Sequence, residues 1–306
     1  MPTIQLQNIT KKYGKKEVLT DVNATIKQGE CFAIIGSNGK GKSTLLKIMA
    51  GIIAADVGKV SYDSLNISKD RKKILQDVGY FPETPALYEE FTVQENLNLF
   101  KKLSSSKNKI SDEQLNHWLK LLQVDGSLDV LAGKLSKGMQ YKVSFIRSLL
   151  GNPKTLLLDE PNANIDNDTL LQLKKELIQL KATGMTIVIV THQLSFLTGL
   201  ADRVAFLQNS LKSELSADEF FKLNKRPLLE VDCEPASDAV IKALSLKDPD
   251  LQLNQERTHI RLQLKEPLKN YNDFISELLT TGLKVKQFYE VAITPEQLYK
   301  RIIKKD

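Results

Sequence analysis

Cysteine, tryptophan and histidine are scarce in this sequence, with two, one and three residues among 306. The two cysteines, Cys31 and Cys233, lie far apart, and Cys31 falls within an apolar run. Disulfide frameworks belong to oxidising compartments, whereas isolated cysteines in apolar surroundings are usually free and buried. We therefore expect two free, buried thiols, which suits a reducing cytoplasm.

Long hydrophobic runs are absent as well. No uninterrupted apolar stretch approaches the ~18–20 residues that are needed to cross a bilayer, and the first residues, Met1 to Gln5, lack the hydrophobic core of a signal peptide. If the protein acts on a membrane process, another chain must supply the membrane-spanning part.

Long runs of charges of the same sign are also absent from the sequence. The net charge of +6 comes from 43 basic and 37 acidic residues, with one basic cluster near the end at Lys300, Arg301, Lys304 and Lys305. This pattern favours a solvated surface over a nucleic-acid-binding one, although attraction to an anionic membrane surface stays open. The apolar fraction of 42% is that of a globular protein, and the length allows one large domain and a smaller one.

A glycine-rich segment fits the phosphate-binding pattern G-x-x-x-x-G-K-[ST] without a mismatch. The wholly apolar residues 31–35 before it predict a buried strand, and residues 44–50 after it predict a helix. Strand, glycine-rich loop and helix are the context that the pattern requires. The candidate phosphate-binding residues are Gly36, Ser37, Asn38, Gly39, Lys40, Gly41, Lys42, Ser43 and Thr44.

The residue types of this segment suit a phosphate chemically. Glycines let the backbone turn tightly, so that successive N–H groups point at phosphate oxygens beside the positive end of the helix dipole. Lys42 offers an ammonium to the β- and γ-phosphates, and the Ser43 hydroxyl can ligate Mg²⁺. For Lys40 two orientations stay open, toward the phosphates or toward solvent.

An acidic pair follows the apolar run at residues 155–158. Open α/β sheets place ligands at the carboxyl ends of their strands. We expect Asp159 to hold Mg²⁺ and Glu160 to act as a general base that polarises a water molecule for attack on the bound phosphate. A simple helix cap is disfavoured by the preceding strand and by the following Pro161.

Residues 135–140, Leu-Ser-Lys-Gly-Met-Gln, closely resemble the signature sequence, LSGGQ and its variants, of ATP-binding cassette proteins. With the phosphate loop and the acidic pair in the same order and spacing, residues 1 to about 215 resemble the ATP-binding subunit of an ABC transporter. The resemblance implies an α/β, P-loop NTPase domain with a helical subdomain, ATP and Mg²⁺ as ligands, and ATP hydrolysis as the activity.

The resemblance also implies roles for residues outside the phosphate loop. Tyr13 lies where the family stacks an aromatic ring on adenine. Glu83 stands at the Q-loop position, where a glutamine usually contacts Mg²⁺, and its carboxylate adds a negative charge that an amide lacks. Asp166 ends the D-loop, and His192, after the apolar run 186–190, matches the H-switch histidine that touches the γ-phosphate.

In the signature segment, Ser136 and Gly138 keep the positions that the family directs at the γ-phosphate bound by the opposite subunit. Lys137 replaces the first of the two glycines. The resemblance therefore predicts a homodimer with ATP held between the phosphate loop of one copy and the signature of the other.

Three regions are expected along the chain. Residues 1–215 form the ATP-binding domain, with a helical subdomain at about 84–150 that has helices at 93–103 and 113–122. A turn at 208–210 follows the final core strand of this domain. Residues 216–227 form a linker helix. Residues 228–306 form a small α+β accessory domain, whose predicted order βαββαβ suggests a ferredoxin-like fold. This domain has no catalytic constellation, which favours a regulatory or dimer-bracing role over ligand binding.

These patterns predict an ATPase subunit of an exporter-like (ABC-2 type) transporter, peripheral on the cytoplasmic face of the cell membrane. Its partner is a membrane-spanning permease on a separate chain, and no nucleic acid is expected. The alternative is a soluble ABC-type ATPase that drives an assembly or translation-related process. Ribosome-acting relatives typically carry two cassettes, and this chain has one. The transported substrate is not predicted, because its pocket belongs to the permease.

Overall fold

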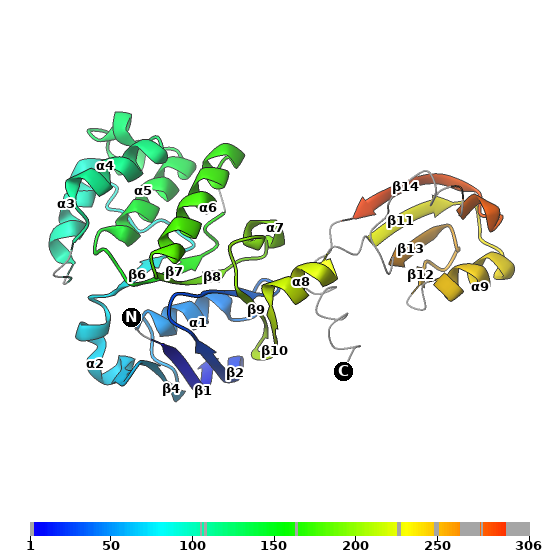
Figure 1. Cartoon of the computed structure of the whole chain (residues 1–306), viewed down its shortest axis with the longest axis horizontal. Coiled ribbons are helices and arrows are strands. Elements are labelled where there is room, and N and C mark those ends of the chain that lie inside the picture. Colours follow the sequence, from blue (N-terminus) through cyan, green and yellow to red (C-terminus); the bar gives the residue numbers. More distant parts are fainter. Residues whose placement is uncertain are drawn as a thin grey trace. The chain divides into compact units, whose positions relative to one another are not determined.

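The computed structural model describes residues 3–104, 106, 109–162, 165–224, 228–247, 251–263, 276 and 278–291. The chain divides into two compact units, Met1–Ala217 and Asp218–Asp306, which are drawn in Figure 1. The sequence-based division into 1–215, 216–227 and 228–306 stays a prediction. Among the described residues, no helix is both long and apolar enough to cross a membrane. Cys31 and Cys233 are buried and free, as expected.

The first unit is built on a six-stranded sheet with the order β10-β9-β3-β8-β7-β6. Its inner strands pair in parallel, and β10 pairs antiparallel with β9. All residues of β3, β7 and β8 are buried, because a parallel sheet is covered on both faces. The strands are β3 (Cys31–Ile35), β6 (Val78–Phe81), β7 (Thr155–Asp159), β8 (Thr186–Val190), β9 (Arg203–Gln208) and β10 (Ser210–Ser216).

The turn predicted at 208–210 follows β9, and a further strand, β10, comes after it at the edge of the sheet. Asn209 adopts a φ of 68°, which closes a tight hairpin between β9 and β10. Asparagine tolerates this left-handed conformation better than most residues. β10 is rich in serine and short of β-branched residues, so its composition hides the strand.

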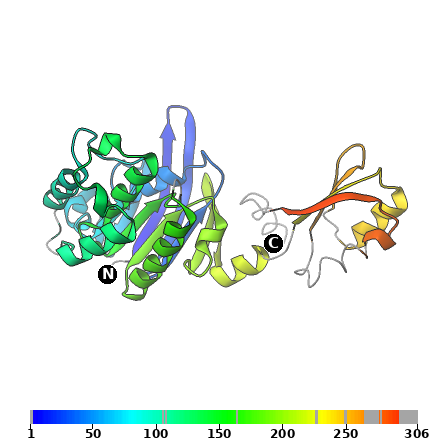
Figure 2. The ribbon, with the colours of Figure 1, turned by 90° about the horizontal axis from the view of Figure 1, so that it is seen from above.

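The first unit contains a second sheet, which is antiparallel and has the order β2-β1-β4-β5. Its strands are β1 (Ile4–Tyr13), β2 (Lys16–Ile26), β4 (Val57–Tyr62) and β5 (Leu65–Asn66), and Figure 2 shows the long β1–β2 pair in blue. The helix α1 (Lys42–Met49) lies between the two sheets (Figure 1). Ile4 of β1, Leu45 of α1 and Val188 of β8 belong to one buried cluster, so the helix after the phosphate loop is held from both sides.

Helices make up the rest of the first unit. α3 (Val93–Leu103) and α4 (Asp112–Leu121) match the predicted helices within one residue, and each begins with a capping box. α5 (Lys137–Leu149) packs against β6 through aromatic contacts of Phe81 with Phe145 and Tyr141. The other helices are α2 (Ile67–Ile74), α6 (Asn167–Ala182) and α7 (Leu194–Leu197), and short 3₁₀ turns lie at Asp125–Ser127 and Ala132–Lys134.

The second unit contains an antiparallel sheet with the order β12-β13-β11-β14. The chain crosses over from β11 (Leu228–Cys233) through α9 (Asp238–Lys247) to β12 (Gln252–Leu253). Strand β13 (His259–Gln263) then lies in the sheet between β11 and β12. Strand β14 (Val285–Val291) pairs on the other side of β11. This split βαβ arrangement is the one that the predicted ferredoxin-like order requires. Of the predicted second helix, Ser276 and residues 278–280 are described, and they are helical. The helix α8 (Ala217–Asn224) begins at the boundary of the two units.

Candidate functional site

The phosphate loop runs from the end of β3 to the start of α1, and close backbone contacts require a glycine at its two ends, Gly36 and Gly41. A Cβ atom on Gly36 would lie 2.4 Å from the carbonyl oxygen of Leu207 in β9. Gly41 has a φ of 93° and caps α1, and a Cβ there would lie 2.8 Å from the carbonyl oxygen of Val18. The loop is therefore pressed against the domain, while Asn38 and Gly39 at its tip are exposed.

Lys42 is buried at the first position of α1, and its ammonium lies inside the loop. Nζ donates hydrogen bonds to the carbonyl oxygens of Gly36, at 2.8 Å, and Ser37, at 3.1 Å. These two acceptors belong to the loop itself, so the positive charge stands where a phosphate would be held. Lys40 is half-buried and Thr44 lies within α1.

Ser43 meets the first carboxylate of the acidic pair. Its Oγ donates a hydrogen bond of 2.9 Å to Oδ1 of Asp159, at the end of β7. Asp159 is fully buried, and its Oδ2 has no hydrogen-bond partner among the described residues. The pKa of Asp159 is raised to about 6, chiefly by burial and also by the nearby charges of Glu83 and Glu160, against the lowering effect of the hydrogen bond from Ser43.

This pair of oxygens fits Mg²⁺. The ion prefers hard oxygen ligands and is usually held by one or two protein groups together with water and substrate phosphates. A buried carboxylate with an open oxygen beside a hydroxyl provides such groups, and a bound cation would offset the burial of its charge. No group of three or more histidine, cysteine or acidic residues that could hold a metal occurs in the described part of the chain. A magnesium site completed by phosphates does not need one.

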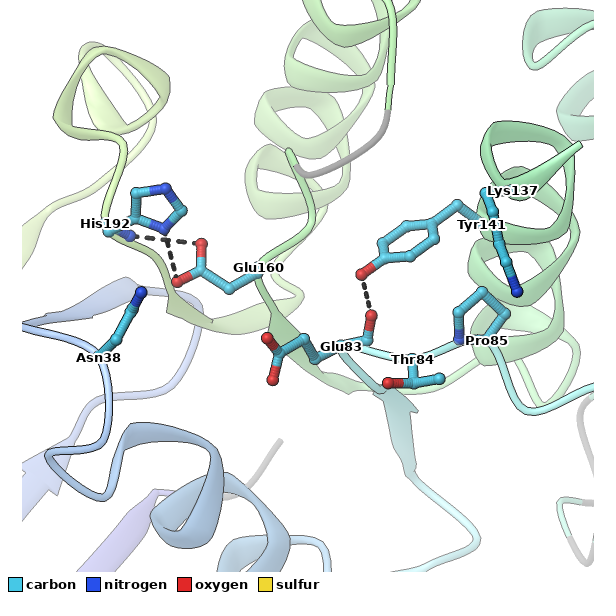
Figure 3. Close-up of a pocket in the computed structure, with 8 residues that line it drawn as sticks. All are labelled: Asn38, Glu83, Thr84, Pro85, Lys137, Tyr141, Glu160 and His192. Carbon is cyan, nitrogen blue, oxygen red and sulfur yellow. Dashed lines mark hydrogen bonds and ion pairs between the residues drawn. The ribbon is translucent and has the colours of Figure 1, made fainter.

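Glu160 and His192 come together from the ends of neighbouring parallel strands (Figure 3). Oε1 of Glu160 lies 2.9 Å from Nδ1 of His192, and Oε2 accepts a 3.3 Å hydrogen bond from the His192 backbone N–H. Glu160 is 7% exposed and adopts a left-handed φ of 50°, with its own N–H donating to the Val190 carbonyl at 2.8 Å. A non-glycine residue in this region costs about 1–3 kcal/mol, so these contacts hold the carboxylate in a defined place.

A cavity of about 410 Å³ opens beside this pair. Asn38 of the phosphate loop and Glu83 at the predicted Q-loop position both line it, and the Glu83 carboxylate lies near Glu160 (Figure 3). Tyr141 of α5 donates a hydrogen bond to the Glu83 carbonyl, which ties this segment to the signature helix. The lining residues are Asn38, Glu83, Thr84, Pro85, Lys137, Tyr141, Glu160 and His192.

The remaining predicted residues lie outside this cavity. Tyr13, at the end of β1, is 52% exposed, with the Lys11 ammonium 5.7 Å from its ring centroid. Ser136 caps α5 by accepting a 3.2 Å hydrogen bond from the Met139 N–H, and Gly138 lies in the first turn of that helix. Neither Ser136 nor Gly138 lines the cavity beside Glu160.

Asp166 has a structural function that its place in the D-loop did not predict. It caps α6 by accepting a 2.9 Å hydrogen bond from the Thr169 N–H, and Lys142 of α5 lies 3.3 Å away. The hydrogen bonds from Thr169 are the largest cause that lowers the pKa of Asp166 to about 2. The predicted D-loop spans residues 163–166, and of these Ala163 and Asn164 lie outside the described part of the chain.

Two polar residues of the site were not selected from the sequence. Asn162 and Thr191 are both buried, and the Thr191 hydroxyl donates a 2.7 Å hydrogen bond to Oδ1 of Asn162. Each lies within two residues of Glu160 or His192, which is the only sequence signal that could have drawn attention to them.

Comparisons with known proteins agree with this geometry. Residues 19–163 match the family model described as ABC transporter. An uncharacterized ABC transporter ATP-binding protein of Methanocaldococcus jannaschii is 35% identical over 207 residues, which cover 68% of this chain and 74% of that protein. The chain belongs to the family of ABC transporter ATP-binding proteins.

Relatives in this family are named for the transport of different compounds. The glutamine transport ATP-binding protein GlnQ of Geobacillus stearothermophilus is 31% identical over 233 residues, covering 74% of this chain and 96% of that protein. The Nod factor export ATP-binding protein I of a Rhizobium species is 30% identical over 209 residues, covering 68% of this chain and 69% of that protein. A solved dimeric ATP-binding cassette in a post-hydrolysis state, bound to ADP and Pi, matches with a TM-score of 0.64 and 28% identity, covering 70% of this chain and 98% of that one.

Family membership confirms the predicted cassette fold, an α/β P-loop NTPase domain with a helical subdomain. It also confirms that the chain is an ATPase that binds ATP and Mg²⁺. ATPases of this family form dimers and work with separate membrane-spanning permease chains. The chain is thus the ATP-binding subunit of an ABC transporter.

Proposed function

We propose that two copies of this chain close on two ATP molecules and so power the export of a substrate through a separate membrane-spanning chain, from the cytoplasmic face of the membrane. The observation that carries the motor part of this proposal is the contact between Glu160 and His192 at the ends of β7 and β8, beside a cavity that the phosphate loop also lines. The export part rests on the resemblance to the Nod factor export protein.

Binding begins at the phosphate loop. The loop N–H groups and the N-terminal end of α1 face the phosphates, and Lys42 exchanges its two carbonyl acceptors for phosphate oxygens. Tyr13, exposed at the end of β1, offers its ring to the adenine. Ser43 and Asp159 hold Mg²⁺, and the charge of Glu83 lies near enough to Asp159 to contribute to its raised pKa. When bound, Mg²⁺ supplies charge neutralisation at the β- and γ-phosphates.

Hydrolysis depends on the buried carboxylate. Glu160 takes a proton from the attacking water, and its two hydrogen-bonding contacts with His192 orient it for this task. In the structure both Glu160 oxygens face His192, so the carboxylate must turn one of them to the water. His192, which is about half-exposed at its side chain, then becomes available to the γ-phosphate.

The second copy completes the site. Ser136 and Gly138 do not line the cavity of their own chain, so we propose that they reach the γ-phosphate bound by the other copy. Moving an equilibrium from mostly open to mostly closed takes about 5.5 kcal/mol of differential binding. Several hydrogen bonds to charged groups, at roughly 1.5–3 kcal/mol each, could supply it. Loss of the γ-phosphate then reopens the dimer.

A groove of about 340 Å³ on the first unit is our candidate for the contact with the membrane-spanning chain. The Arg147 guanidinium lies in it, 4.8 Å from the Phe100 ring centroid, and donates a 2.7 Å hydrogen bond to the Ala86 carbonyl. Burial lowers the pKa of Arg147. Tyr80 also lines the groove, and its hydroxyl has no hydrogen-bond partner among the described residues.

One segment of the chain links the lining of the groove to the lining of the catalytic cavity. Tyr80 belongs to β6, and the chain passes from that strand to Glu83 in the cavity. Ala86, whose carbonyl Arg147 binds, follows Glu83 in the same segment. A helix of the membrane-spanning chain seated in the groove would therefore press on the segment that carries Glu83.

The direction of transport is tested in living cells. Metabolites in cells and medium are compared between cells that express the wild-type chain and cells that express Glu160→Gln in its place. A compound that leaves the medium and accumulates in the mutant cells supports export. A compound that remains in the medium and is depleted in the mutant cells means import. ATP hydrolysis by the purified chain with no change in any metabolite favours a process other than transport.

A further inference from the structure

We propose that Asn162 is a positioning residue for hydrolysis, which acts through Thr191 to hold the loop that carries His192 against Glu160. This inference rests on the proposed roles of Glu160 and His192. Asn162 follows β7 on the same turn as Glu160, and Thr191 follows β8 directly before His192. Both side chains are buried, Asn162 at 4% exposure and Thr191 at 0%.

In the described part of the chain, side-chain contacts at two places join the loop after β7 to the loop after β8. One is the pair of contacts between Glu160 and His192 in Figure 3. The other is the 2.7 Å hydrogen bond from the Thr191 hydroxyl to Oδ1 of Asn162. Because Glu160 and Asn162 share one turn, and Thr191 and His192 share one loop, the second tie limits how far His192 can move from Glu160.

The Thr191 hydroxyl makes two hydrogen bonds. Its oxygen accepts a 3.0 Å hydrogen bond from the Gln193 backbone N–H. Its proton is donated to Oδ1 of Asn162, so that one hydroxyl serves as donor and acceptor at once. The amide nitrogen then points away, and it has no hydrogen-bond partner in the described part of the chain.

His192 consequently stands on a turn that its two neighbours close. The hydroxyl of Thr191 bonds the N–H two residues on, across His192, as in a Ser/Thr turn. The Thr191 backbone N–H is a weaker anchor, at 3.3 Å from the Ile34 carbonyl. Removing the Asn162 oxygen leaves the Thr191 hydroxyl without its buried acceptor, and the turn loses its link to the Glu160 loop.

The test uses the full chain and three variants. Asn162→Ala removes the acceptor alone, Thr191→Val removes the hydroxyl with its bonds to Asn162 and to the Gln193 N–H at nearly constant shape, and Thr191→Ser keeps both bonds. We expect Asn162→Ala and Thr191→Val to lower kcat for ATP hydrolysis by about 10–100-fold, the effect of a small misplacement in an active site. KM for ATP should stay nearly unchanged, because the phosphate loop is intact, and Thr191→Ser should recover most of the rate.

A spectroscopic readout separates positioning from general stability. The chain has three histidines, so the ring signals of His192 can be assigned by NMR with a His192→Gln variant. Asn162→Ala should shift the His192 ring signals and leave those of His117 and His259 in place. In a His192→Gln background, Asn162→Ala should cause little further loss of kcat, since a positioning residue acts through the group it positions.

Several outcomes would overturn the inference. Wild-type kcat in Asn162→Ala and Thr191→Val would do so, as would unshifted His192 signals or a full additional loss in the His192→Gln background. If Asn162→Ala fails to fold, the Thr191→Val and Thr191→Ser pair decides by the same measurements. If Glu160→Gln hydrolyses ATP at the wild-type rate, the proposed function fails, while the NMR signals still report whether Asn162 holds the loop.

Discussion

The hydroxyl of Ser43, in the first turn of α1, is hydrogen-bonded at 2.9 Å to the fully buried carboxylate of Asp159, at the end of β7. The two residues are far apart in the sequence, yet the pairing of strands β3, β8 and β7 in one parallel sheet brings them together. We propose that their oxygens form the metal-holding side of the nucleotide site.

We predict that Ser43→Ala weakens the Mg²⁺-dependent part of ATP binding by about 10–100-fold, since a lost interaction with a charged group is worth about 1.5–3 kcal/mol. Calorimetric titration with ATP in Mg²⁺ and in EDTA measures this part as the difference between the two affinities. Ser43→Thr keeps the hydroxyl that the loop pattern allows and serves as the control. An unchanged difference in Ser43→Ala would remove Ser43 from the metal site.

Glu160→Gln tests the general base. We expect turnover to fall by roughly 10²–10⁴, the usual contribution of such a base, while ATP binding is preserved because the phosphate loop is untouched. The variant should also accumulate as an ATP-bound dimer, visible by light scattering after size-exclusion chromatography. Hydrolysis at the wild-type rate would refute the assignment.

Arg147→Ala tests the proposed groove. Arginine side chains are common among the residues that carry most of an interface's energy, and truncation costs about 2 kcal/mol or more at such positions. We expect much weaker co-purification with the membrane-spanning chain, while the isolated subunit still binds ATP. Lys120→Ala removes an exposed positive charge of α4 outside the groove and is the matched control. Equal co-purification of the two variants would argue against the groove.

Asp166 gives a prediction for stability against pH. Its pKa is lowered in the folded protein, from 3.8 to about 2, chiefly by the hydrogen bond from the Thr169 backbone. Such a group stabilises the fold above its unfolded pKa, and this stabilisation is lost as the pH falls from about 4 to about 2. Asp166→Asn keeps the cap of α6 and should remove this pH dependence, whereas Asp166→Ala should also lose about 1 kcal/mol at neutral pH.

Denaturant unfolding between pH 2 and pH 7 measures both effects. The difference in unfolding free energy between wild type and Asp166→Asn should shrink as the pH falls. A difference that is constant over this range would show that Asp166 is not the group whose titration matters.

The segments around the phosphates could be predicted from the sequence because their signals are local. The apolar residues 31–35, the glycines and the helical residues after them occur as β3, the loop and α1. α1 begins at Lys42 rather than at Thr44, since the left-handed Gly41 is its N-cap. The bounds of α3 match, because Thr92 and Glu95 form a capping box at its start.

The contacts between loops could not be predicted from residues alone. That His192 meets Glu160, and that Thr191 meets Asn162, depends on β8 lying beside β7 in the sheet, which is a non-local pairing. A single histidine after a strand carries no such information. For the same reason the polar Asn162 gave no signal, whereas resemblance to the family did point to His192.

The left-handed backbone of Glu160 has a consequence for any attempt to make this subunit more robust. A glycine or asparagine would rest there with less torsional cost, by about 1 kcal/mol, but neither has a carboxylate in the same place. Selection for thermal stability alone would therefore favour variants at this position that have lost the ability to hydrolyse ATP. Thermal stability and catalytic rate therefore place opposite demands on the residue at position 160.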